Sequence, residues 1–390
     1  MLSENHKNNI SIYIHWPFCE KKCPYCDFNS YEVKNTIDSK VWRKAYEKEI
    51  NREINRSEPK KIRSIFFGGG TPSLMSCELI EFILKKFNKF WIIDKDTEIT
   101  LEANPSSSMK KYFSILSTVG VNRLSLGFQS INDKTLKFLG RNHTSKESMK
   151  GLEIAKKYFN RVSIDLIYGT PNQTVDEWDA ELENILKISG EHISAYQLTI
   201  EKGTEFYTQF KNNKFSIPSA TTLVNLYNHT DTKLSDCRYN KYETSNYSLP
   251  GAECRHNLDI WQGKQYLGIG PGAHGRVMRQ NRWYATYNFP NPNNWLEKTL
   301  NANGGLLLDR KLSNAERKKE IFLTSLRLTG GLDLNKLKYL TDKNSMEEIY
   351  DKKALVTLHE LGLLKFNKSK IYITSKGFPL LNSILNKILY

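Results

Sequence analysis

Residues 10–26 read ISIYIHWPFCEKKCPYC and place three thiols directly after a run that favours a strand. The run Ile10–Ile14 is rich in β-branched and aromatic residues, which predicts a β-strand. Cys19, Cys23 and Cys26 then follow in a loop at the spacing Cys-x3-Cys-x2-Cys. Structural zinc closes a tetrahedron of four ligands, so three thiols form a poor zinc site by themselves. A cubane iron–sulfur cluster ordinarily takes four thiolates, and three would leave one iron open to another ligand.

Outward from this loop, short strand-like runs alternate with amphipathic segments of helical period. The further predicted strands are Arg63–Phe67, Glu98–Leu101, Arg123–Phe128, Arg161–Ile167 and His192–Leu198. The predicted helices are Asp38–Arg56, Ser76–Phe90, Ser106–Val119, Ser145–Tyr158 and Thr174–Ile188. Strands that alternate with helices form parallel sheets. The pattern therefore predicts an α/β fold, a partial (β/α)6 TIM-like barrel, with a doubly wound sheet as the alternative.

The second half of the chain is less regular. Residues 202–303 contain a predicted helix at Ala220–Ser235 and a glycine-rich turn in the stretch YLGIGPGAHG at 266–275, before a linker at 301–305. Helical patterns at Asn314–Arg327 and Met346–Leu361, followed by short strands at 363–366 and 371–373, resemble a winged helix. We predict a core barrel at 1–235, a barrel extension at 236–304 and a small C-terminal α+β domain at 305–390.

The amino-acid composition limits the classes of protein to which this chain can belong. The chain has 390 residues, 39% of them hydrophobic and 25% charged, and its formal net charge is +15. No apolar run is long enough for a membrane span or a signal peptide, and six cysteines are too few for a disulfide framework, which predicts a cytoplasmic protein. The positive charge is diffuse, and the helical pattern Met346–Leu361 carries four acids that face phosphates badly, so we expect no nucleic-acid partner.

Polar residues gather where the predicted strands end. In such barrels, function collects at the carboxyl ends of the strands. The residues concerned are Cys19–Cys26, Gly68–Pro72, Glu102, Gln129, Asp165 and Gln197. Glycines at 68–70 would let backbone groups approach a ligand, and Glu102 and Asp165 are acceptors suited to ribose hydroxyls or an ammonium group. Arg141 could neutralise a carboxylate. We expect these groups to converge on one mouth.

The cysteine spacing, the aromatic Tyr25 before the last cysteine and the glycine motif after the second strand resemble the radical S-adenosylmethionine superfamily. The resemblance implies a [4Fe-4S] cluster held by Cys19, Cys23 and Cys26, with S-adenosylmethionine on the open iron. It also implies that S-adenosylmethionine is bound by the following residues: Tyr13, Tyr25, Gly69, Gly70, Thr71, Glu102, Gln129, Arg141 and Asp165.

A narrower resemblance covers nearly the whole chain. The strings YIHWPFC, FGGGTPS, EANP, LGFQS, DLIYG and YLGIGPGAH are similar to the oxygen-independent coproporphyrinogen III oxidase group. That group contains true oxidases (HemN) and haem-binding proteins regarded as haem chaperones (HemW). The oxidase motif has a further cysteine where this chain has Phe28, and oxidases carry a longer segment before the cluster than the 18 residues here. Both features favour the HemW branch.

The segment Cys254–Trp261 resembles the HNxxYW haem-binding signature of that branch. The resemblance implies haem at His256, Asn257 and Trp261, with His256 as axial ligand and His274 as the second candidate. The chain departs from the signature at Ile260, where the signature has tyrosine. The expected function is binding haem and transferring it to an acceptor protein, for which a membrane-associated respiratory protein is one class, by a monomer or weak dimer. The alternatives are coproporphyrinogen III oxidation, and a sensor whose cluster controls the winged-helix module.

Overall fold

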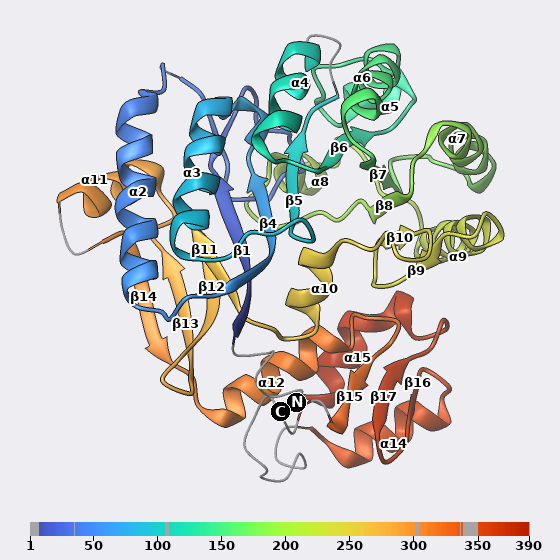
Figure 1. Ribbon diagram of the computed structural model, residues 1–390. Helices are drawn as coiled ribbons and strands as arrows, with labels where there is room; N and C mark the ends of the chain where they lie inside the picture. The colour runs from blue at the N-terminus through green and yellow to red at the C-terminus, as the bar shows by residue number, and fades with distance from the viewer. Residues whose placement is uncertain are drawn as a thin grey trace.

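Six parallel strands form the centre of the molecule (Figure 1). The structure is a computed structural model, and it describes residues 8–34, 36–105, 109–301, 304–335, 337 and 350–389. The central strands are β1 (Asn9–Trp16), β4 (Lys61–Gly69), β5 (Glu98–Ala103), β6 (Arg123–Gln129), β7 (Arg161–Tyr168) and β8 (His192–Gln197). They lie side by side in chain order and all pair in parallel. A doubly wound sheet reverses its strand order at a switch point. The predicted partial barrel is therefore confirmed.

Helices connect these strands and cover the outer face of the sheet (Figure 1). They are α2 (Ser39–Asn55), α3 (Cys77–Phe90), α4 (Lys110–Val119), α5 (Asp133–Phe138), α6 (Ser145–Tyr158) and α7 (Val175–Ile188). After β8, α9 (Ala220–Asp236) packs beside α7, and α8 (Glu205–Lys211) contacts the cysteine loop. Their starts follow local sequence: the Asp38 side chain caps α2, and Thr144 with Glu147 forms a capping box at α6. A short 3-10 helix, Pro72–Leu74, follows β4. The start of the predicted helix Ser106–Val119 lies outside the described residues.

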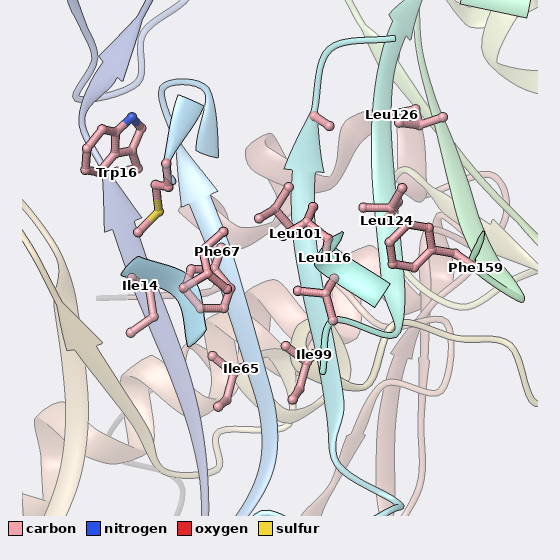
Figure 2. Packing of buried hydrophobic residues seen from close by; sticks show 14 of the residues in the cluster. Ile14, Trp16, Ile65, Phe67, Ile99, Leu101, Leu116, Leu124, Leu126 and Phe159 are labelled. Carbon is pink, nitrogen blue, oxygen red and sulfur yellow. The ribbon is translucent and has the colours of Figure 1, made fainter. Parts of the chain in front are cut away.

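Alternation along the strands separates an apolar outer face from a polar interior. Leu124 and Leu126 of β6 belong to the buried cluster beneath the helices, as do Phe67 of β4 and Leu101 of β5 (Figure 2). The residues between them in β6 point the other way, and Arg123 and the strand-end Gln129 line cavities inside the barrel. Successive side chains of a strand point to opposite faces. The outward-pointing side chains of the strands therefore form the hydrophobic core, and the inward-pointing side chains can form a binding site.

Further strands extend this sheet at both edges. The full order is β14-β13-β12-β11-β1-β4-β5-β6-β7-β8-β10-β9. The added strands are β9 (Asn240–Lys241), β10 (Asn246–Ser248), β11 (Tyr266–Ile269), β12 (His274–Arg279), β13 (Arg282–Asn288) and β14 (Leu306–Lys311). Helix α10 (Arg255–Trp261) packs against β4 and β1, and α11 (Pro292–Asn301) lies beside α2. A separate pair of short parallel strands, β2 (Phe18–Cys19) and β3 (Tyr31–Glu32), brackets the cysteine loop.

The glycine-rich stretch 266–275 contains the expected turn, at 270–273, between strand β11, which pairs in parallel with β1, and the start of strand β12. One expectation is corrected: the Arg- and Asn-rich composition around His256 indicates a loop, whereas the segment is helix α10. Polar residues favour loops locally, whereas packing on β4 stabilises the helix.

A small C-terminal unit packs below the barrel (Figure 1). It comprises α12 (Asn314–Ser325), β15 (Leu332–Asp333), α14 (Lys352–Glu360), β16 (Leu364–Phe366), β17 (Lys370–Ile373), a 3-10 turn at Phe378–Leu380 and α15 (Leu381–Ile388). The helix expected from Met346 begins at Lys352, and 346–349 lie outside the described residues. Strand β14 falls inside the predicted domain 305–390 but pairs with the large sheet. The division into three domains stays a prediction.

None of the helices in the described ranges is long and apolar enough to cross a membrane.

Candidate functional site

The cysteine loop leaves the carboxyl end of β1 and is fixed by its own backbone. Lys22 Nζ donates to the carbonyl oxygens of Phe28 (3.1 Å) and Ser30 (3.2 Å). The Cys26 N–H donates to the Cys23 carbonyl at 3.0 Å, which closes a tight turn between the second and third cysteines. These contacts order the loop without using the sulfur atoms of the cysteines.

The three thiols have different surroundings, and none of them is in a disulfide. Cys19 is buried, and burial raises the pKa of its thiol to about 11. Burial also raises the pKa of the Cys26 thiol, which lies 3.6 Å from the Ser30 hydroxyl. Cys23 Sγ accepts a hydrogen bond from Arg141 Nη1 at 3.4 Å. Since thiolates rather than thiols ligate metals, a cationic group or metal is needed here to favour the ionised form.

The glycine turn after β4 packs directly on the cysteine strand. The Gly70 N–H donates to the Trp16 carbonyl and the Thr71 N–H to the Phe18 carbonyl, both at 2.7 Å. A Cβ atom at Gly70 would lie 2.5 Å from the Phe18 carbonyl oxygen, and Gly69 has a positive φ of 118°. The glycines are therefore required by contact with the neighbouring backbone, in addition to any approach by a ligand.

Two half-buried acids, Glu102 of β5 and Asp165 of β7, line the same cavity as the cysteines. Burial, together with the charge of Asp165, raises the pKa of Glu102 to about 8, although the Gly69 N–H donates to it at 3.2 Å. Burial also raises the pKa of Asp165, whose carboxylate accepts from the Ser125 hydroxyl at 2.8 and 3.1 Å. Glu102 is therefore mostly protonated at neutral pH and can donate as well as accept.

Arg141 joins three elements at this site. Its Nη2 donates to Asn104 Oδ1 after β5 (2.5 Å) and to the Gly127 carbonyl in β6 (3.1 Å), while Nη1 reaches Cys23. Gly140 (φ 70°) allows the close approach, because a Cβ atom there would lie 2.6 Å from Pro24 of the cysteine loop. Burial lowers the pKa of the Arg141 guanidinium, but the nearby Tyr25 and Cys23 raise it by more. The pKa of Arg141 is therefore raised above its ordinary value.

One cavity of about 290 Å³ collects most of the predicted residues. Its lining includes Cys19, Cys23, Tyr25, Cys26, Gly69, Gly70, Thr71, Glu102, Gln129, Arg141, Asp165 and Gln197. Gln129 adopts a positive φ of 65°, an uncommon conformation for a residue other than glycine that is often associated with functional sites.

Sequence reasoning missed other residues that line this cavity, among them Asn104, Ser125, Gly127 and Tyr196. A signal existed, because residues 123, 125, 127 and 129 are non-hydrophobic while the residues between them are apolar. Such alternation indicates a strand with one polar face.

Tyr13 is placed elsewhere, in a second cavity of about 220 Å³ deeper in the barrel. His256 and Asn257 line this second cavity, together with Glu102, Asp165 and Tyr196, which also line the first. The Tyr13 hydroxyl lies 3.1 Å from His15 Nδ1 and does not reach the cysteine cavity.

His256 is 2% exposed and lies in helix α10 rather than in a loop. Its Nδ1 bonds to the Ser64 hydroxyl at 2.9 Å, its ring stacks on Phe66, and its Nε2 has no hydrogen-bond partner. Burial lowers the pKa of His256 to about 4, so the imidazole is neutral. Because His256 is buried and its cavity measures about 220 Å³, the structure offers no open face for a tetrapyrrole at Nε2.

The other predicted haem residues are dispersed. Trp261, at the end of α10, does not line this cavity, and the guanidinium of Arg327 lies 5.2 Å over its ring. His274, the second candidate, is exposed at the start of β12 and stacks on Tyr287 with ring centroids 4.1 Å apart. The structure therefore does not bring His256, Asn257 and Trp261 together into one surface groove.

The donor set fits an iron–sulfur cluster better than a single metal ion. Among the described residues, no three His, Cys, Asp or Glu side chains converge on one point as ligands for one ion. Thiolates that hold a cubane cluster bind different irons and surround the cluster. Three free cysteines that line one cavity beside a guanidinium suit that arrangement, and Cys19, Cys23 and Cys26 would hold the cluster.

Fold and site together define a radical S-adenosylmethionine protein. The model of the radical SAM superfamily matches residues 13–185, and the model of the HemN C-terminal domain matches residues 312–380. Membership of this superfamily implies a [4Fe-4S] cluster and S-adenosylmethionine.

The chain belongs to the HemW family within that superfamily. It is 34% identical to the heme chaperone HemW of Buchnera aphidicola over 96% of this chain and 97% of the relative. It is 30% identical to the heme chaperone HemW of Mycobacterium tuberculosis, over 97% and 95%. It is 32% identical to the mitochondrial radical S-adenosyl methionine domain-containing protein 1 of Bos taurus, over 97% and 87%.

Among solved structures, the coproporphyrinogen III oxidase HemN of Escherichia coli is similar in fold. The TM-score is 0.82 over 97% of this chain and 90% of that chain, at 21% sequence identity. The likeness concerns the fold, including the small C-terminal unit, and confirms the predicted fold class.

Proposed function

We propose that this protein is a haem chaperone: it binds haem and delivers it to an acceptor protein in the cytoplasm or at a membrane surface. Support comes from near full-length similarity to proteins named heme chaperone HemW. The structural observation that carries the proposal is the convergence of the cysteine loop, the glycine turn and two half-buried acids on one cavity.

Cys19, Cys23 and Cys26 hold the cluster in this proposal, and S-adenosylmethionine occupies the rest of the cavity. The cluster supplies an electron-transfer centre with one open iron. Tyr25 forms an apolar wall against Phe206, with ring centroids 6.3 Å apart. Glu102 and Asp165 offer oxygen atoms for hydroxyl or ammonium groups, and Gly69, Gly70 and Thr71 offer backbone at the rim. Gln129 and Arg141 supply amide and guanidinium donors; Tyr13 supports this site through His15.

His256 is the proposed haem ligand. An orienting hydrogen bond on one imidazole nitrogen with the other left free is the usual arrangement of a metal-ligating histidine. His256 has this arrangement, through Ser64 on Nδ1 and an unpartnered Nε2. Because the residue is buried, ligation requires α10 to shift from β4, with Asn257 and Trp261 moving alongside.

The test is an anaerobic incubation of the reconstituted protein with S-adenosylmethionine, a reductant and either haem or coproporphyrinogen III. Haem absorbance and protoporphyrinogen formation are followed together. We expect a stable haem spectrum and no decarboxylated product. Turnover to the divinyl product would overturn the proposal in favour of oxidase activity, and absence of haem binding would remove the chaperone role altogether.

The Cys23→Ala variant is a matched control in the same assay. If haem binding needs the folded barrel but not the cluster, the variant still binds haem while it lacks cluster absorbance. If the variant also loses haem, binding depends on the loaded cluster.

A further inference from the structure

We infer that Arg141 is a positioning residue that sets the reduction potential of the cluster, through an N–H donated to the sulfur of Cys23. The inference rests on the proposed cluster at the three cysteines. It assigns Arg141 a role separate from the neutralisation of a ligand carboxylate, and the two roles can coexist on one guanidinium.

The geometry of Arg141 is fixed without any ligand. Nη2 is held by Asn104 Oδ1 and the Gly127 carbonyl, which lie at the ends of two neighbouring strands. The Arg141 N–H donates to the Leu136 carbonyl at 2.9 Å, so the backbone is tied to α5 as well. Because Nη2 is held in place, Nη1 of the same guanidinium points at Cys23 Sγ, 3.4 Å away.

Donors remain on the guanidinium after these contacts. Nε is buried and has no partner among the described residues. Arginine presents five N–H donors in a rigid planar fork, so the sulfur contact does not use up the group. A carboxylate bound in the same cavity could therefore engage Arg141 without displacing Cys23.

The direction of the effect follows from charge. Hydrogen bonds to cluster sulfurs and the net charge nearby help to set the potential of an iron–sulfur centre. A reduced cluster carries one more negative charge than an oxidised one, so a nearby cation and an N–H donor stabilise the reduced form more. Arg141 should therefore raise the potential and make the cluster easier to reduce.

The loop offers a control cation. Lys21 lines the same cavity but is exposed, and its charge is screened by solvent. Lys21→Met and Arg141→Met each remove one positive charge near the cysteines, but only Arg141→Met removes a donor to sulfur. Arg141→Lys keeps the positive charge but loses the planar guanidinium and its fixed N–H donors.

The experiment is a potentiometric titration followed by EPR, in the absence of S-adenosylmethionine, on wild type and the three variants at matched iron and sulfide content. We expect a clearly more negative midpoint for Arg141→Met, an intermediate value for Arg141→Lys and little change for Lys21→Met. Leaving out S-adenosylmethionine removes any contribution through its carboxylate. An Arg141→Met midpoint equal to that of wild type or of Lys21→Met would overturn the inference.

A second measurement needs no variant. Wild-type protein labelled with ¹⁵N-arginine and reduced should show a nitrogen coupling to the cluster in pulsed EPR, since Arg141 is the one arginine among the described residues that line the cavity. Absence of that coupling in a loaded cluster overturns the inference even if the variants fail to load. If the wild type itself takes up no cluster, the proposed cluster site fails instead, and the two failures are distinguishable.

Discussion

The backbone N–H of Gly69 donates a hydrogen bond of 3.2 Å to Glu102 Oε2 and ties the glycine turn after β4 to the third strand of the barrel. Glu102 is half-buried and lies near a second acid, Asp165, whose charge also raises its pKa. The bond orients the carboxyl group, but burial outweighs it and the pKa stays high.

This raised pKa makes stability depend on pH. In the unfolded chain Glu102 ionises near pH 4.5, and in the folded protein near pH 8, so the folded state binds more protons in between. Its contribution to stability is therefore present below pH 4.5 and is lost as pH rises towards 8, at no more than about 1.4 kcal/mol per pH unit. Glu102→Gln should flatten the profile of unfolding free energy over this window. The exposed Glu153→Gln is the control, and parallel profiles for Glu102→Gln and wild type would refute the assignment.

Gly70 should be intolerant of a side chain. Gly70→Ala places a methyl group 2.5 Å from the Phe18 carbonyl oxygen, which is backbone and cannot rotate away. We expect a loss of about 1–3 kcal/mol in unfolding free energy, as for other overpacked sites. Gly330→Ala is the matched control, because a Cβ atom there meets nothing within 4 Å. Urea unfolding of both cluster-free variants measures the difference, and equal midpoints would argue against the close contact.

Cys23→Ala should abolish the absorbance and EPR signals of the reconstituted cluster, because only two thiolates remain. The exposed Cys237 lies outside the cavity, so Cys237→Ala should leave cluster content unchanged. The measurement is iron and sulfide content per protein with EPR after reduction. A full cluster in Cys23→Ala would move the site to other ligands.

The proposed haem ligand, His256, can be distinguished from the second candidate, His274, by mutation. His256→Ala should weaken haem binding or shift the Soret band while cluster signals persist, because it removes the nitrogen left free inside the barrel. His274→Ala removes an exposed ring stacked on Tyr287 and should leave the haem spectrum unchanged. Haem titrations of both variants, with circular dichroism to check folding, decide the matter. The reverse pattern would transfer ligation to His274 on the surface.

Sequence patterns predicted the barrel well because its strands and helices are encoded locally. Each predicted central strand overlaps an observed one, since β-branched runs and N-cap residues act within a few positions. The cysteine and glycine motifs were also recognised in the sequence, because they are defined by spacing along the chain. Strand β11 and helix α10 were missed for the opposite reason: their residues favour turns locally, whereas β11 pairs with the distant strand β1 and α10 packs on the distant strand β4.

The sequence by itself determined the class of fold, the cysteine loop and the set of strand-end residues, because period and spacing are properties of neighbouring residues. The tertiary structure alone decided that Arg141 meets Cys23 across 118 positions, that Tyr13 lies below the cavity rather than in it, and that His256 is buried with one nitrogen free. These outcomes depend on which strands lie side by side and how closely they pack. Burial then shifts the pKa values of Glu102 and His256, an effect that no local pattern records.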